Sequence, residues 1–206
     1  MISEAGVYMK IIIIFGPQAV GKMTIGEQVG KFLNLPLLHN HVTLDAIWPY
    51  IGWNDDTFKL STQLRMGIFD YISKKESHPG IIFTFVWAFD NEDDWNNVEE
   101  IKRMFNKPSH EIYFVELSAD LDERLKRNIS AYRLEKKPSK RNINHSEAEL
   151  KYSIKKHRLN SYEGEIKEKN YMRLDVTELS VSESSQLIID WIKGEHHGKF
   201  RKSDHY

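Results

Sequence analysis

The strongest chemical signal in the chain is the nine-residue run from Gly16 to Thr24. It reads Gly-Pro-Gln-Ala-Val-Gly-Lys-Met-Thr and fits the frame G-x-x-x-x-G-K of a phosphate-binding loop. Gly16 and Gly21 permit backbone angles that a side chain would penalise, so successive N–H groups can wrap a phosphate at the positive end of a helix. Lys22 would place its ammonium on the terminal phosphates. Met23 replaces the hydroxyl that normally follows this lysine, which leaves Thr24 as the predicted magnesium ligand.

This run is flanked by the elements that such a loop needs. A buried strand is predicted before it and a helix after it, which argues against an ordinary glycine-rich turn. The residues that we expect to line the phosphate site are Gly16, Gln18, Ala19, Val20, Gly21, Lys22, Met23 and Thr24.

Residues 124–158 form a strongly basic segment. It holds twelve lysines and arginines against three glutamates, whereas the whole chain has a formal net charge of −1. Phosphoryl transfer uses such a cluster, because arginines from a lid stabilise the charge that spreads over the transferred group. We expect Arg133 to be such an arginine. For most of the lysines the alternative is a solvated face, and an RNA-binding patch would need more interleaved aromatics than Tyr132 and Tyr152.

Candidate proton acceptors follow the second predicted strand, Leu35–His39. The strand runs into His39-Asn40-His41, and Asp45 follows four residues after His41. An imidazole titrates near neutral pH, so His39 or His41 could act as a general base, with Asp45 orienting it or taking the proton itself. The alternative is that His41 caps a turn and Asp45 is a surface carboxylate. A zinc site is not expected, because no third ligand has a motif spacing.

The third predicted strand, Ile81–Ala88, leads further side chains to the same edge of the sheet. Ligands of parallel sheets bind at the carboxyl ends of the strands. Trp87 would form a wall of the acceptor pocket, with core packing as its alternative, and Asp90 would contact water-bound magnesium or the acceptor. Further wall candidates are Trp48, Trp53 and Trp95. The predicted acceptor-binding residues are His39, His41, Asp45, Trp87, Asp90, Arg141 and Arg158, and the predicted catalytic residues are Lys22, His41, Asp45 and Arg133.

Apolar runs of strand length alternate with helical patterns along the chain, which predicts a parallel sheet sandwiched by helices. The five predicted strands are Lys10–Phe15, Leu35–His39, Ile81–Ala88, Glu111–Leu117 and Tyr171–Leu174. The predicted helices are Lys22–Leu33, Asp56–Lys74, Asp93–Phe105, Asp120–Ile129, Glu147–Lys169 and Val181–Lys193. The expected fold is a three-layer α/β/α sandwich around a five-stranded parallel sheet, with a basic lid at residues 130–158.

Length and composition bound the remaining possibilities. The 206 residues suit one domain with a single core, and the absence of cysteine excludes thiolate metal sites and a cysteine nucleophile. The near-zero net charge excludes a uniformly basic nucleic-acid coat. We find no apolar run near the roughly 20 residues of a membrane span and no signal peptide, so we expect a cytoplasmic protein without a membrane partner. Residues 1–8 are expected to be a dispensable extension and residues 194–206 a frayed tail.

The motif G-x-x-x-x-G-K-x-T, with no hydroxyl directly after the lysine, resembles that of the adenylate-kinase-like P-loop kinases. The layout of residues 9 to 193 is similar to that of shikimate and gluconate kinases. The resemblance implies ATP and Mg²⁺ as cofactors, a mobile lid, and phosphoryl transfer to a small molecule or nucleotide. Shikimate-type kinases end the second strand in D-x-D where this chain has His39-Asn40-His41, which argues against shikimate itself as the acceptor.

The same resemblance supplies expectations for the adenine end of the site. The run Asp122–Arg127 resembles the helix before the lid, in which an arginine packs on adenine, and this implies Arg124 or Arg127 in that role. The run Leu174–Ser180 resembles the loop that passes beneath adenine. It implies contacts from Asp175 and Thr177, and capping of the last helix is an equal alternative for both.

The first functional hypothesis is an ATP-dependent phosphotransferase that moves the γ-phosphate to a small-molecule or nucleotide acceptor. The alternatives are an ATP-binding regulator or NTPase without such an acceptor and an RNA-associated protein built on the basic segment. A GTPase is not favoured, because the nearest match to N-K-x-D, Asn106–Ser109, lacks the aspartate. The sequence does not favour nucleic acid as a partner, and the chain is expected to be a monomer or a homodimer.

Overall fold

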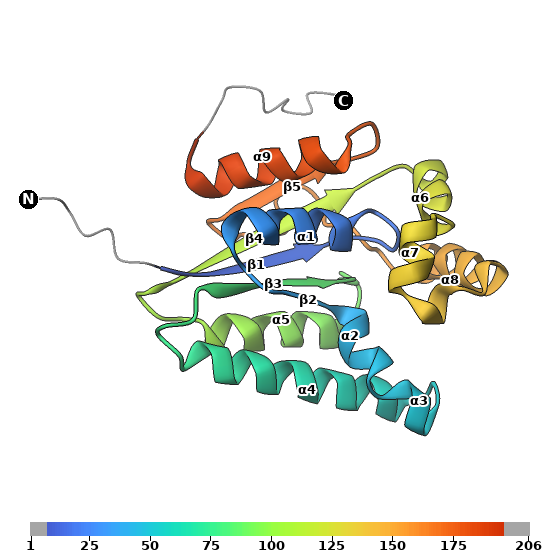
Figure 1. Ribbon diagram of the computed structural model, residues 1–206, viewed down its shortest axis with the longest axis horizontal. Helices are drawn as coiled ribbons and strands as arrows, with labels where there is room; N and C mark the ends of the chain where they lie inside the picture. The colour runs from blue at the N-terminus through green and yellow to red at the C-terminus, as the bar shows by residue number, and fades with distance from the viewer. Residues whose placement is uncertain (1–7, 196–206) are drawn as a thin grey trace, which may run out of the picture.

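A computed structural model of the chain describes residues 8–195. Its sheet contains five parallel strands in the order β2-β3-β1-β4-β5 (Figure 1). The strands are β1 (Met9–Phe15), β2 (Leu37–His39), β3 (Gly80–Phe85), β4 (His110–Ser118) and β5 (Tyr171–Asp175). The predicted five-stranded parallel sheet is confirmed, although β3 ends at Phe85 and not at Ala88.

The central strand β1 pairs with β3 on one side and β4 on the other. Successive side chains of a strand point to opposite faces, so Ile11 and Ile13 belong to one core and Ile12 and Ile14 to the other. All four isoleucines are almost fully buried. A strand that is covered on both faces needs a continuous apolar run, which is why the isoleucines mark the centre of the sheet.

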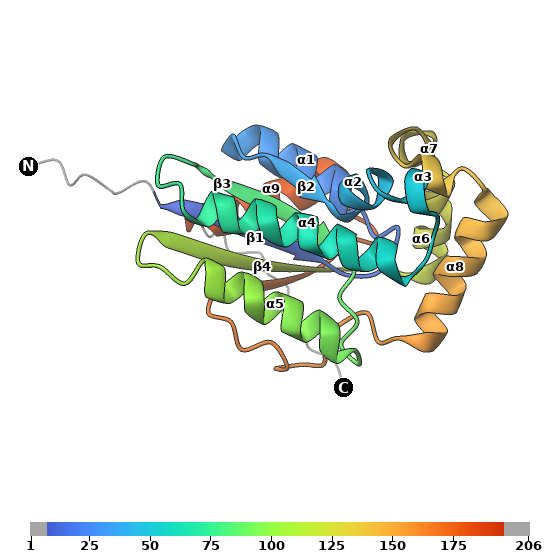
Figure 2. The same cartoon turned by 90° about the horizontal axis from the view of Figure 1, so that it is seen from below.

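Helices cover both faces of the sheet. α1 (Lys22–Leu33) and α9 (Val181–Lys193) lie on one face, and α4 (Asp55–Ser73) and α5 (Glu92–Met104) lie on the other (Figures 1 and 2). A capping box between Ser180 and Glu183 fixes the start of α9. The predicted three-layer α/β/α sandwich is therefore confirmed.

The basic segment folds into short elements beyond the carboxyl ends of the strands (Figure 1). They are α6 (Leu121–Asn128), α7 (Ala131–Lys136), a 3₁₀ turn (Pro138–Lys140) and α8 (Ile143–Lys156). We call residues 130–158 the lid segment.

The helix predicted over Glu147–Lys169 is wrong in its second half, because α8 ends at Lys156. Beyond it, the backbone N–H of Arg158 donates to Asp90 Oδ1 at 3.1 Å. The hydroxyl of Ser161 donates to Glu116 Oε2 at 2.6 Å, and Glu116 is fully buried in β4. These bonds to distant parts of the chain hold residues 157–170 in an irregular path, which local periodicity does not report.

Two short helices that the sequence analysis did not predict connect β2 to α4. They are α2 (Asn40–Asp45) and α3 (Trp48–Ile51). Asn54 then caps α4, since its Oδ1 accepts from the N–H of Thr57 at 3.0 Å. In the part of the chain that the structure describes, no helix is long and apolar enough to cross a membrane. Most of the predicted extension and tail, residues 1–7 and 196–206, lies outside that part.

Candidate active site

The loop between β1 and α1, which we call the glycine loop (Gly16–Gly21), adopts a backbone that its glycines require. Gly16 has φ +135°, and a Cβ atom there would lie 2.2 Å from the carbonyl oxygen of Leu117 in β4. Gly21 has φ +113° and is the N-cap of α1. Its lack of a side chain leaves the first N–H groups of the helix uncapped, with no acidic residue in the first turn. This helix end can bind an anion.

Lys22 bends back over the glycine loop. Its Nζ donates to the carbonyl oxygens of Gly16 at 2.6 Å and Pro17 at 2.7 Å. Burial holds the pKa of Lys22 well below its usual value, and the positive charges of Lys137, Arg133 and other nearby cations lower that pKa further. Several cations around one uncapped helix end repel each other, and a polyanion between them would relieve that repulsion.

Two arginines of α6 support the loop from the other side. Arg124 is 5% exposed and its Nε donates to Gln18 O at 2.8 Å. Arg127 donates through Nη1 to Val20 O at 3.0 Å and through Nη2 to Val176 O at 2.7 Å. Arg127 therefore ties the glycine loop to the segment after β5. Arg127 lines the cavity described below, whereas Arg124 lies behind it.

The predicted adenine-loop residues Asp175 and Thr177 bond to each other and to the start of α6. Asp175 Oδ1 accepts from Thr177 N at 2.8 Å, and Thr177 Oγ1 accepts from Asp120 N at 3.0 Å. Neither residue lines the cavity. Their neighbours Val176, Leu179 and others of the same segment form its wall instead.

A cavity of about 1010 Å³ begins at the glycine loop and continues to the carboxyl ends of β2 and β3. The lid segment forms one of its walls. Ligand pockets usually span about 300–1000 Å³, so this one has room for two small molecules side by side. The cavity brings together the predicted residues Gln18, Ala19, Val20, Gly21, Lys22, Met23, Thr24, His39, His41, Arg127 and Arg133.

Two neutral histidines stand at the end of the cavity away from the glycine loop, with their rings 6.5 Å apart. Burial and the charge of Lys137 lower the pKa of His39 to about 4. Burial and the lid cations, Lys137 first, hold the pKa of His41 well below its usual value. Both imidazoles are therefore uncharged at neutral pH and available as hydrogen-bond partners. Asp45 lies near them but does not line the cavity, and its Oδ1 accepts from Trp48 Nε1 at 3.2 Å.

The lid segment supplies the cations that face Lys22. Arg133 lines the cavity, and its buried Nε has no partner in the described part of the chain. Burial lowers the pKa of Lys137 to about 7, and the neighbouring charges of Arg133 and Lys140 act in the same direction. An unpaired buried guanidinium nitrogen is costly, so this arrangement favours an anionic ligand.

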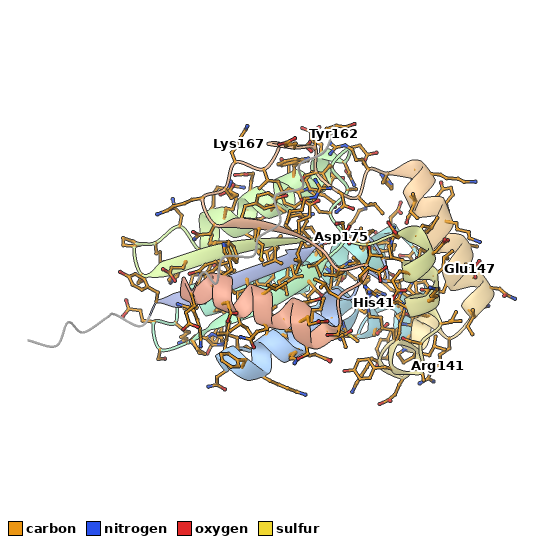
Figure 3. All side chains as sticks on the ribbon, turned by 90° about the horizontal axis from the view of Figure 1, so that it is seen from above. His41, Arg141, Glu147, Tyr162, Lys167 and Asp175 are labelled. Atoms are coloured by element: carbon orange, nitrogen blue, oxygen red, sulfur yellow. The ribbon has the colours of Figure 1, made fainter. Side chains whose placement is uncertain are left out.

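Besides Asp45, four other residues predicted to bind the acceptor do not line this cavity, and for them the structure does not support that placement. Trp87 is 2% exposed and packs against Phe15, Phe89 and Trp95, in the same core as Phe83 and Phe85 of β3. The other three make contacts elsewhere: Asp90 with His157, Arg158 with Glu165, and Arg141 with Leu134 O. Figure 3 shows Arg141 at the outer edge of the lid segment.

The sequence analysis missed Leu44, Phe58 and Lys137, which also line the cavity. Trp53 does so as well, and it was one of several tryptophans considered as pocket walls. Phe58 lies on a helix whose apolar spacing predicts core packing, yet its side chain is 53% exposed. The apolar spacing of α4 alone does not predict this exposure, because it depends on how α2 and α3 lie beside the start of α4.

Comparisons with known proteins add evidence at the level of fold. No model of a protein family matches the sequence, and no curated protein matches it. A protein of Chloroflexus aurantiacus J-10-fl, to which a kinase function has been attributed, is similar with a TM-score of 0.63 and 14% identity, covering 93% of this chain and 100% of that one. A gluconokinase of Sinorhizobium meliloti 1021 has a TM-score of 0.58 and 13% identity, over 91% and 93%.

An APS kinase of Mycobacterium tuberculosis is also similar, with a TM-score of 0.57 and 11% identity over 90% of this chain and 98% of that one. The fold is that of the P-loop kinases. The structural similarity establishes the fold, and at identities this low it does not identify the reaction. In this P-loop kinase fold the glycine loop, the lid segment and the ends of β2 and β3 surround one cavity.

The residues of the site fit a nucleotide with its magnesium ion. The phosphates fit the uncapped helix end, the unpaired Arg133 Nε and the ammonium of Lys22. Thr24 lines the cavity one turn into α1 and offers a hydroxyl. The described residues contain no cluster of three or more histidine, aspartate or glutamate side chains that could hold a metal. Mg²⁺ takes much of its coordination from phosphate oxygens and water.

Proposed function

We propose that the protein is an ATP-dependent phosphotransferase that moves the γ-phosphate to a small-molecule acceptor. The observation that carries the proposal is the position of Lys22. It is the first residue of α1, at the uncapped end of the helix, and it lies close to the lid cations Arg133 and Lys137. The cavity also continues past Lys22 to His39 and His41, which leaves room for an acceptor. This additional space in the cavity favours a transferase over an ATP-binding regulator without an acceptor.

The nucleotide binds with its triphosphate against the glycine loop. The N–H groups at the start of α1 and the ammonium of Lys22 hold the phosphate oxygens. Arg127, Val176 and Leu179 line the cavity, and the adenine base would lie against them. Thr24 would hold Mg²⁺, which neutralises developing charge on the β- and γ-phosphates when it is bound. The similar APS kinase was solved with AMPPNP and APS, which supports a nucleotide and an acceptor side by side in this fold.

The reaction is an in-line displacement at the γ-phosphorus. The acceptor oxygen forms a bond to phosphorus, the bond to the bridging oxygen of ADP breaks, and the hydroxyl proton leaves the acceptor. His41 is neutral and lines the cavity, so its imidazole can take that proton. Phosphoryl transfer needs little help from a base, and positioning by Lys22 and Arg133 supplies most of the rate.

The Lys22→Ala variant tests this proposal. AMPPNP with Mg²⁺ should raise the melting temperature of the wild-type protein, and the variant should lose that shift together with ADP release from ATP. We expect activity to fall by at least about 10²–10³-fold, the typical cost of removing one group that stabilises transition-state charge. Lys31→Ala is the matched control, because Lys31 lies on the same helix with an exposed side chain. An unchanged AMPPNP shift in Lys22→Ala would contradict the proposal.

A further inference from the structure

The end of the cavity near β2 has an aromatic wall. Trp53 and Phe58 line it with 47% and 53% of their surface exposed. Trp48 lies behind Trp53, with ring centroids 5.5 Å apart and planes inclined by 14°. The ring of Phe58 is 6.1 Å from that of Trp53. Large apolar faces that gather in a cavity are stabilised when a ligand covers them, and a flat ring matches a supported indole best.

The polar groups at this end are suited to a hydroxyl group. His39 and His41 are neutral, and the amide oxygen of Asn40 accepts from Arg65 Nη1 at 2.6 Å. Neutral imidazoles exchange hydrogen bonds with hydroxyl groups.

Cations also lie near this end of the cavity. Lys140 pairs with Glu149 at 2.5 Å. Arg65 donates to neutral oxygens, among them Ser61 Oγ at 2.7 Å and Thr62 Oγ1 at 2.8 Å, and it does not line the cavity. The charges of Arg133 and Lys137 act on Lys22, where the triphosphate would bind, and also on His41. The lid cations therefore serve both ends of the cavity, and the aromatic wall is the feature that selects the acceptor.

We propose that the acceptor is an alcohol that carries a flat aromatic or heteroaromatic ring. The inference rests on the proposed function and names the substrate class of the same site. The ring lies against Trp53 and Phe58, and the hydroxyl points toward His41 and the γ-phosphate. The acceptor oxygen bonds to the γ-phosphorus, ADP leaves with the bridging oxygen, and His41 takes the proton. Polyols and sugar acids without such a ring lack the stacking contact.

Measurement of ADP release with three classes of acceptor tests this inference. The probes are adenosine, uridine and 4-hydroxybenzyl alcohol as ring alcohols, gluconate as a sugar acid, and sorbitol as a polyol. We expect at least one ring alcohol to raise ADP release more than tenfold above the acceptor-free rate, and gluconate and sorbitol to leave it unchanged. Equal or greater stimulation by gluconate or sorbitol overturns the inference, and so does a lack of response to all three ring alcohols.

The AMPPNP shift separates the two proposals. If AMPPNP stabilises the protein through Lys22 while the ring alcohols fail, the nucleotide site stands and the acceptor class is wrong. If AMPPNP gives no shift, the proposed function itself fails.

Substitutions of Trp53 provide the second test. We expect Trp53→Ala to raise the KM of the active ring alcohol by about two- to tenfold, because the variant lacks the aromatic face on which the ring stacks. The AMPPNP shift should stay the same, and Trp53→Phe should restore most of the affinity. Tyr50→Ala is the control, since Tyr50 lies on α3 with 85% exposure and does not line the cavity. An unchanged KM in Trp53→Ala, with a normal melting temperature, overturns the inference. If Trp53→Ala fails to fold, the KM of Trp53→Phe and the quenching of wild-type tryptophan fluorescence by the ring alcohol are measured instead. An absence of quenching then overturns the inference.

Discussion

The two ends of the cavity are built in different ways. At the glycine-loop end, backbone groups and buried cations form the site, and the position of Gly16 is fixed by contact with the backbone of β4. At the other end, the walls are side chains of α2, of the segment between α3 and α4 and of the start of α4, and they include half-exposed aromatic rings. A backbone-built site has few sequence solutions, whereas a side-chain-built site can change its ligand by substitution.

Substitution of Arg133 should produce the largest effect. Arg133→Ala is expected to lower the rate of phosphoryl transfer by about 10³-fold or more, because an arginine that reaches the transferred group stabilises its spreading charge. Arg133→Lys should recover only a small part, since an ammonium lacks the planar fork of donors. The measurement is single-turnover transfer with ATP and the active acceptor.

The comparison between the two ends becomes sharper if Arg133→Ala lowers the transfer rate far more than it lowers the AMPPNP shift and leaves the KM of the acceptor close to wild type. Lys151→Ala is the matched control, as an exposed cation on α8 that pairs with Glu147. If Arg133→Ala keeps its transfer rate and loses acceptor affinity instead, Arg133 belongs to the acceptor end and the assignment made above is wrong.

The sequence analysis succeeded where local pattern and backbone geometry coincide. The isoleucine run of β1 predicted a strand that is buried on both faces, and the G-x-x-x-x-G-K frame predicted the loop that leads into α1. The placement of the strands in one parallel sheet followed from the alternation of element types. These features are encoded within short windows of sequence.

The analysis failed where contacts between distant residues decide the path. Residues 157–170 continue a helical pattern, yet Asp90 and Glu116 capture Arg158 and Ser161 and end α8 at Lys156. Trp87 lies beyond the end of β3 and packs in the core with Phe83 and Phe85, which is the alternative that the sequence left open for it. The acceptor-side walls depend on α2 and α3, which are too short to leave a periodic signal.

Gly16→Ala should have the next largest effect. A residue with a Cβ at φ +135° is strained by about 1–3 kcal/mol, and the added atom would overlap the carbonyl of Leu117. We expect a lower melting temperature and loss of the AMPPNP shift. The acceptor end should remain intact, which quenching of tryptophan fluorescence by the ring alcohol would report.

Gly67→Ala is the matched control for this glycine. Gly67 lies within α4 and a Cβ there would meet nothing within 4 Å, so alanine should stabilise the protein by about 1 kcal/mol. If Gly16→Ala is as stable as wild type and binds AMPPNP normally, the glycine loop does not depend on its backbone conformation, and the contrast between the two ends disappears.

The smallest expected effect is a pH dependence that originates in Lys137. Burial lowers the pKa of this lysine to about 7 in the free protein, so its charge is present below pH 7 and is lost as the pH rises through that value. A bound triphosphate favours the charged form and raises the pKa again. Affinity for AMPPNP should therefore fall as the pH rises above 7, by at most about tenfold per pH unit for one coupled proton.

The effect of Lys137 is separated from the titration of the nucleotide by comparison with Lys137→Met. Between pH 6 and 9, calorimetric titrations with AMPPNP should show a steeper loss of affinity for wild type than for the variant, and their curves should converge at high pH, where Lys137 is neutral in both the free and bound states. The acceptor KM should depend on this substitution less than the nucleotide affinity does. Parallel curves for the two proteins would mean that nucleotide binding does not change the protonation of Lys137. Lys22 and Arg133 would then be the cations of this cluster that bind the phosphates.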